Sequence, residues 1–217
     1  MKVLNPTNKH HGYQYKIGLN VLDTKFNDNP KESCAPGGFY FTTQKHIPDY
    51  YSFGTKVHQI FLPFNDPDFR MVKDGNDEKF RANKIILGEK EYSLFESLTY
   101  ELFGWNMQKN IFLFDFASEY GMTDELEKLK NHCLAMGWYQ KLANGKIKVG
   151  LTYSDLTMDV ASAKGYIHVL NWWKESGLEL QYSYHSMNWA SEHGHINVLQ
   201  WWRNSGLIKD PGLRSKI

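Results

Sequence analysis

The chain has 217 residues and a formal net charge of +1, from 25 Lys and Arg against 24 Asp and Glu. With 41% hydrophobic and 23% charged residues, it has the composition of a globular protein, which excludes a disordered or collagen-like chain. Nucleic-acid binding depends on a basic excess that this chain lacks, and no apolar run approaches the ~20 residues of a membrane span. We therefore expect neither nucleic acid nor a membrane as a partner.

The N-terminal part of the sequence predicts an α+β domain over residues 1–92. β-Branched and aromatic residues cluster in short runs there, as is typical of strands. We predict strands at 38–43, 56–62, 69–73 and 79–87. A short helix is expected over 49–53, between the first two of these strands.

Residues 93–116 are predicted to connect this domain to the rest of the chain. The segment 93–105 carries Leu94, Leu98, Leu102 and Trp105 at helical spacing. That spacing predicts a helix that buries its apolar side.

The C-terminal part contains an internal repeat, which decides architecture before any local prediction. Residues 153–181 and 182–210 align without a gap at a period of 29, and 14 of the 29 columns are identical. A degenerate copy over 117–152 keeps the Ala-Ser-x-x-Gly core and then enters an irregular insert at 136–151. A short tail, 211–217, follows the last copy.

Each clear copy predicts two short antiparallel helices. In the first copy, Ser154 is placed to begin a helix that Gly165 ends. The second helix carries Ile167, Leu170 and Trp173 on one apolar stripe. The second copy repeats these signals at Ser183, Gly194, Ile196, Leu199, Trp202 and Gly206.

The pattern A-S-x-x-G-x-I-x-V-L-x-W-W-x-x-S-G-L resembles the helix pair of ankyrin repeats, and more narrowly the variant repeats of ankyrin-repeat proteins of giant DNA viruses. The segments HHGYQYKIGLN, GGFYFTTQKHI and EKFRANKIIL resemble the region found ahead of such repeats. The resemblance implies an α+β N-terminal domain followed by an all-α, ankyrin-like helical-repeat stack. The 29-residue period is shorter than the ~33 residues of ordinary ankyrin repeats, and their Thr-Pro-Leu-His segment is absent.

The same resemblance implies a function. It indicates a non-catalytic protein–protein interaction module of a viral protein that acts inside an infected host cell, in the cytoplasm. The partner would be another protein, which the sequence does not identify, and no cofactor is implied.

The aromatic residues of the two clear copies supply the candidate binding positions. Trp173 and Trp202 continue the apolar stripe and are expected in the core. Trp172 and Trp201 lie about 100° further around their helices, where they either cover a helix edge or anchor a partner. The candidate protein-binding residues are Trp172, Trp201, Tyr184 and Trp189.

The N-terminal part carries the alternative of an enzyme. His11-Gly12, the run 37–42 and the tyrosines that follow resemble mono-ADP-ribosyltransferases. The resemblance implies a His that orients the nicotinamide ribose, a Tyr that stacks on nicotinamide and a Glu that stabilises an oxocarbenium-like centre. The matching residues are His11, Tyr40 or Tyr51, and Glu78 or Glu89. Tyr13 stands where that family usually has a small hydroxyl residue, so an active or degenerate transferase targeted by the repeats is the second hypothesis.

Other chemistry has little support in the sequence. His185, His193 and His195 lie close together, but no Cys or carboxylate completes a zinc set at the usual spacing. Glycine-rich nucleotide-binding motifs are absent. Cys34 and Cys133 are expected to be free thiols. We therefore expect no metal, no cofactor and no catalytic residue.

Overall fold

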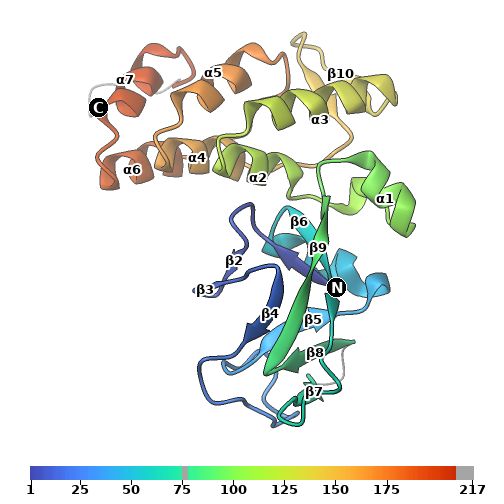
Figure 1. The fold of residues 1–217 in the computed structure, drawn as a ribbon. Helices are drawn as coiled ribbons and strands as arrows, with labels where there is room; N and C mark the ends of the chain where they lie inside the picture. Colours follow the sequence, from blue (N-terminus) through green and yellow to red (C-terminus); the bar gives the residue numbers. More distant parts are fainter. Residues whose placement is uncertain (75–77, 209–217) are drawn as a thin grey trace. The chain divides into compact units, whose positions relative to one another are not determined.

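The computed structural model describes residues 1–74 and 78–208 (Figure 1). The chain divides into two compact units, unit 1 over Met1–Met107 and unit 2 over Gln108–Ile217. The division falls inside the region 93–116 that was predicted to connect two domains. The predicted tail 211–217 and the last two residues of the final copy lie outside the described residues.

Unit 1 is built on two antiparallel sheets. One has the strand order β1-β6-β9-β4 and the other has the order β5-β8-β7. The strands of the first sheet are β1 (Lys2–Leu4), β6 (Lys56–Phe61), β9 (Lys84–Ser93) and β4 (Gly18–Val21). The second sheet consists of β5 (Phe39–Thr42), β8 (Lys79–Ala82) and β7 (Met71–Lys73). A separate hairpin is formed by β2 (Lys9–His10) and β3 (Tyr13–Gln14).

The core of unit 1 draws on both sheets. Phe39 and Phe41 point to the same side of β5, because side chains alternate along a strand. They belong to one buried cluster with Ile85 and Leu87 of β9. The alternating aromatic and aliphatic residues that predicted these strands therefore also form their core.

The predicted strands at 38–43 and 56–62 are confirmed as β5 and β6. The predicted strand 79–87 is instead two strands, β8 and β9, which belong to different sheets. Asn83 separates them, because its amide donates to Arg70 O at 3.1 Å and its carbonyl accepts from Leu22 at 2.8 Å. The first bond continues the pairing of β8 with β7 and the second continues the pairing of β9 with β4, so the chain passes from one sheet to the other at Asn83.

The helices of unit 1 are shorter or tighter than predicted. The expected helix at 49–53 is part of a 3₁₀ segment, Gln44–Phe53. The expected helix at 93–105 is reduced to α1 (Ser97–Phe103), and a 3₁₀ turn at Met107–Lys109 follows it at the boundary between the two units. Leu98 and Leu102 were predicted to be buried, but they are 70% and 58% exposed, so the apolar spacing did not indicate burial here.

The described part of unit 2, residues 108–208, contains three pairs of helices. They are α2 (Leu113–Glu119) with α3 (Thr123–Ala135), α4 (Leu156–Ala163) with α5 (Ile167–Glu175), and α6 (His185–Glu192) with α7 (Ile196–Asn204). The first helices of the pairs contact one another in chain order, as do the second helices (Figure 1). The two helices predicted for each clear copy are thus confirmed.

The prediction of an all-α stack after the N-terminal domain is wrong. The described residues form a mixed α and β fold with four sheets, and one of these lies in unit 2. The insert at 136–151 forms a hairpin of β10 (Tyr139–Lys141) and β11 (Ile147–Val149), and Ile147 also bridges to Leu178. Its turn contains Asn144-Gly145, a dipeptide that favours tight hairpins because Gly145 takes a positive φ of 79°.

The helix-ending glycines have the expected role. Gly165 and Gly194 have φ of 76° and 72°, the left-handed conformation that ends a helix. At Gly165 an added Cβ would also lie 2.8 Å from the His195 ring. The apolar stripe of α7 differs from the prediction, since Val198 is buried whereas Ile196 is 67% exposed.

Candidate functional site

A recurring polar contact fixes the first helix of each clear copy to the first helix before it. Asp115 accepts from Ser154 N at 3.1 Å and from Ser154 Oγ at 2.8 Å. Asp159 accepts from Ser183 N at 2.9 Å and from Ser183 Oγ at 2.5 Å. Each serine oxygen also accepts from the amide two residues further on, so the serine caps its helix as predicted while it is held by the preceding helix.

Trp173 and Trp202 make a second recurring contact. Trp173 Nε1 donates to Ser118 Oγ and Trp202 Nε1 to Ser162 Oγ, both at 2.9 Å. The two tryptophans are 0% and 1% exposed. Their predicted place in the core is confirmed, and each indole N–H has the partner that a buried donor requires.

The preceding tryptophans, Trp172 and Trp201, are half-buried and contact the neighbouring second helix. Trp172 Nε1 donates to Glu127 Oε2 at 3.0 Å, and Trp201 Nε1 donates to Asn171 Oδ1 at 2.6 Å. Glu127 and Asn171 occupy equivalent places in α3 and α5. Covering a helix edge, one of the two roles left open by the sequence, is therefore realised.

A lysine lies over the ring of each of these tryptophans. Lys130 Nζ is 5.7 Å from the Trp172 ring centroid, and Lys174 Nζ is 6.0 Å from that of Trp201. Both distances are within the range of a cation–π contact. The two indoles are thus held from two sides, which leaves only part of each ring open to a partner.

The remaining two candidates lie at α6, Tyr184 directly before its first residue and Trp189 within the helix. Tyr184 is 62% exposed and Trp189 is half-buried. The His185 ring lies between them, with centroids 4.0 Å from Tyr184 and 4.7 Å from Trp189. We call these three residues the α6 aromatic surface. Sequence reasoning found two of its members and missed His185.

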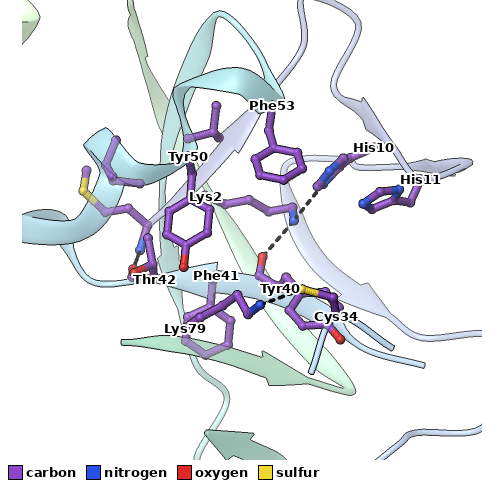
Figure 2. A pocket seen from close by; sticks show the side chains of 13 residues that line it. Lys2, His10, His11, Cys34, Tyr40, Phe41, Thr42, Tyr50, Phe53 and Lys79 are labelled. Atoms are coloured by element: carbon purple, nitrogen blue, oxygen red, sulfur yellow. Dashed lines mark hydrogen bonds between the residues drawn. The ribbon is translucent and has the colours of Figure 1, made fainter. Parts of the chain in front are cut away.

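A cavity of about 150 Å³ opens in unit 1 (Figure 2). β1, β5, the β2–β3 hairpin and the 3₁₀ segment supply most of its wall. A larger cavity of about 580 Å³ shares part of this wall. The shared residues are Lys2, His10, His11, Cys34 and Tyr40.

The residues of the transferase hypothesis are only partly brought together. His11 and Tyr40 line both cavities. Tyr51 is 2% exposed and packs in the core instead. Glu78 and Glu89 line neither cavity. The structure therefore places the His beside one Tyr but does not place either candidate acid with them.

A buried charge cluster lies beside the cavity. Asp74 Oδ1 is 3.0 Å from Arg81 Nη1, and Asp74 Oδ2 is 2.7 Å from Lys79 Nζ. Lys79 Nζ also donates to Cys34 Sγ at 3.0 Å, which lowers the pKa of the exposed Cys34 thiol. Cys34 is separated from Lys79 by 45 residues, and no local motif in the sequence indicated this contact.

Two observations bear on metals and membranes. Within residues 1–74 and 78–208, no group of three or more His, Cys, Asp and Glu side chains is arranged to hold a metal ion. No helix in this part of the chain combines the length and apolar character that crossing a bilayer requires.

Comparison with known proteins gives viral relatives. No family model and no solved structure matches the chain. An uncharacterized protein of Acanthamoeba polyphaga mimivirus is 40% identical over 164 residues, which are 76% of this chain and 45% of the relative. A mimivirus protein named "Putative ankyrin repeat protein" is 43% identical over 57% of this chain and 62% of its own length.

The shared region is only part of these relatives. The chain spans less than two thirds of the length of each of these two relatives. A third mimivirus protein, also named "Putative ankyrin repeat protein", is 43% identical, and the match covers 30% of its length. Further mimivirus relatives extend the range of identity from 31% to 44%. The homologues are thus mimivirus proteins, and several of them carry ankyrin-repeat names.

Proposed function

We propose that this chain is a non-catalytic protein–protein interaction module of a viral ankyrin-repeat-type protein, and that it binds its partner through unit 2. The names of several mimivirus homologues support the ankyrin type. The recurring Ser, Asp and Trp contacts support a rigid framework, because each clear copy is fixed to the helices before it by the same bonds.

The observation that carries the proposal is the α6 aromatic surface. Large aromatic rings that are ordered before binding lose little conformational entropy when they are covered, and such rings dominate the energetics of many interfaces. Asp159 holds the start of α6, and the His185 ring stacks on Trp189. Tyr184, which is 62% exposed, then stands at the edge of an ordered apolar surface.

Trp172 and Trp201 form the second part of the proposed interface. Their open edges lie on α5 and α7, and their indole N–H groups are already bonded within unit 2. We assign them supporting contacts at the margin, where apolar edges exclude water.

The partner in this proposal is a protein of the infected host cell, and the site of action is the host cytoplasm. The near-zero net charge supports a protein in preference to nucleic acid. We do not extend the proposal to ADP-ribosyl transfer, because neither Glu78 nor Glu89 lines the cavity that holds His11 and Tyr40.

The test replaces the α6 aromatic surface by residues that the neighbouring copy already carries. Asp155 and Val160 occupy the places of Tyr184 and Trp189 in the first clear copy, so the variant Tyr184→Asp/Trp189→Val retains residues that this fold accepts. Proteins captured by the wild type from an Acanthamoeba lysate are identified by mass spectrometry. The affinity of the purified partner is then measured by biolayer interferometry. We expect a loss of at least about tenfold in the double variant.

The matched control is Phe64→Ser, which removes an aromatic ring that is 72% exposed in unit 1. The control should bind the partner as the wild type does. Unchanged affinity in a folded Tyr184→Asp/Trp189→Val variant would reject the proposed surface.

A further inference from the structure

Lys2 is a buried cation without a counter-ion. Its side chain lies in the wall of the unit 1 cavity, and the residue is 3% exposed. Lys2 Nζ donates to Tyr40 O at 2.8 Å and contacts His10 Nδ1 at 3.5 Å (Figure 2). It also lies 4.6 Å from the Tyr15 ring centroid. All three partners are uncharged in the ordinary pH range. Among the described residues, no carboxylate forms an ion pair with Lys2.

Burial without an opposite charge is unfavourable for an ammonium group. Burial lowers the pKa of Lys2 to about 7, from its ordinary value of 10.5. An anion placed beside Lys2 would restore the preference for the charged form. The lysine is therefore poised to gain from a negatively charged ligand.

His10 adds an unsatisfied polar atom to the same wall. Its Nε2 is buried and has no hydrogen-bond partner among the described residues. Burial is the main cause that lowers the pKa of His10 to about 3, so the ring is neutral near pH 7. When Nδ1 accepts from Lys2, the proton of a neutral imidazole resides on Nε2, which is then a free donor.

The rest of the wall is mainly apolar and aromatic. Phe41, Tyr50 and Phe53 line the cavity, and no Asp or Glu is found among the described lining residues. The cavity volume of about 150 Å³ equals that of an engineered protein cavity that binds one benzene molecule. The site thus combines space for one ring with a cation and an unused donor.

We propose that this cavity binds a small monoanionic carboxylate that carries one flat apolar ring. The carboxylate pairs with Lys2 Nζ and accepts from His10 Nε2, and the ring lies against Tyr50 and Phe53. Lys79 also lines the cavity, but unlike Lys2 it already has a carboxylate partner, since its Nζ lies 2.7 Å from Asp74 Oδ2. This site lies in unit 1 and is independent of the protein-binding surface proposed for unit 2.

Binding of such an anion takes up a proton. Lys2 is partly neutral near pH 7 in the free protein, and the paired carboxylate raises its pKa, so affinity falls as the pH rises above 7. The other titratable groups that line this cavity or face Lys2 from a neighbouring element are the Met1 amine, His10, His11, Tyr15, Cys34, Tyr40, Tyr50, His58 and Lys79. Glu91 of β9 lies opposite His58 of β6, and its carboxylate pairs with Lys56 at 3.0 Å.

Titration calorimetry with benzoate and with its uncharged analogue benzamide tests the proposal on the full chain, with any affinity tag at the C-terminus so that β1 keeps its sequence. We expect benzoate to bind, benzamide to bind at least about tenfold more weakly, and Lys2→Met to lose at least about tenfold in benzoate affinity. The control Lys45→Met, which removes an exposed lysine of the 3₁₀ segment, should bind as the wild type does. Benzoate binding near pH 7 should also take up protons, measured from the heats in two buffers of different ionisation enthalpy.

Several results would overturn the proposal. They are the absence of saturable benzoate binding, equal affinity for benzamide, and full affinity in a folded Lys2→Met variant. If Lys2→Met does not fold, the benzoate–benzamide contrast and the proton uptake of the wild type decide the question without it. If benzoate binding to the wild type releases protons, or takes up none, the anion pairs with a group other than Lys2 and the proposed site is rejected.

Discussion

The two units bury their polar groups in different ways. Unit 2 repeats a small set of contacts, in which one Ser bonds to an Asp and a different Ser bonds to a Trp, at equivalent places in successive helix pairs. Unit 1 instead gathers full charges at one position, around Arg81, which is 0% exposed. Buried polar contacts are therefore spread over several separate places in unit 2, whereas in unit 1 they are concentrated around one side chain.

Arg81 shows how far this concentration goes. Its guanidinium donates to groups from several separate segments of unit 1. The acceptors are Asn27 O at 2.8 Å, Glu32 O at 2.6 Å, Tyr40 Oη at 3.0 Å, Asp74 Oδ1 at 3.0 Å and Asn29 O. One side chain thus orders the loop before β5 and the end of β7 together.

The largest expected effect is therefore at Arg81. Arg81→Met removes one of the two cations that pair with the buried Asp74 and leaves several backbone carbonyls without their donor, so unit 1 should lose about 3–5 kcal/mol of its free energy of unfolding. Hydrogen exchange followed by mass spectrometry resolves the two units, and unit 2 should be unchanged. Arg70→Met, at an exposed arginine, is the control. Equal loss of protection in both units would contradict the separation.

A smaller and graded effect is expected in unit 2. Asp159 accepts from Ser183 N, Ser183 Oγ and Ser186 Oγ, whereas Asp115 accepts from two groups of Ser154. Asp159→Ala should cost about 2–3 kcal/mol and Asp115→Ala about 1–2 kcal/mol. Six of the seven tryptophans lie in unit 2, so urea unfolding followed by tryptophan fluorescence measures this difference. A larger loss of stability in Asp115→Ala than in Asp159→Ala would show that the number of hydrogen bonds does not determine the loss.

The buried serines test whether the recurring contacts are equivalent. Ser118→Ala and Ser162→Ala each leave one buried indole N–H without an acceptor, so each should lose about 1 kcal/mol. The double variant should lose the sum to within about 0.5 kcal/mol, as independent sites do. The same fluorescence titration gives all three values, and strong non-additivity would show that the contacts act as one group.

The last prediction concerns the chemical reactivity of the two cysteines and involves no expected loss of stability. The hydrogen bond from Lys79 lowers the pKa of the exposed Cys34, whereas burial raises the pKa of Cys133. Iodoacetamide should therefore modify Cys34 at least about tenfold faster at neutral pH, because the thiolate is the nucleophile. Peptide mass spectrometry measures both rates. A Cys34 rate that still rises steeply above the ordinary thiol pKa would argue against the influence of Lys79.

The sequence predicted unit 2 better than unit 1 because the information there is local. The 29-residue period placed four helices and the buried Trp173 and Trp202 correctly, since spacing within one helix decides which side is covered. The hairpin at 139–149 was missed, although Asn144-Gly145 is a recognisable turn signal. The all-α prediction failed at this point.

The charge cluster and the cavity of unit 1 could not be predicted in the same way. Tyr40 and Asn27 are 41 and 54 residues from Arg81, and Tyr40 is 38 residues from Lys2. Such contacts depend on how the two sheets pair, which no local pattern in the chain specifies. For the same reason the transferase resemblance placed His11 near Tyr40 but gave no guide to where Glu78 or Glu89 lies.

The hairpin between α3 and α4 also bears on how far a connection between helix pairs can vary in length. The Asp115–Ser154 contact joins residues 39 apart and the Asp159–Ser183 contact joins residues 24 apart, yet the bonds are the same. The difference, 39 − 24 = 15 residues, is taken up by the segment that contains β10 and β11. Connections between helix pairs can therefore grow or shrink while the contacts that join the pairs stay intact.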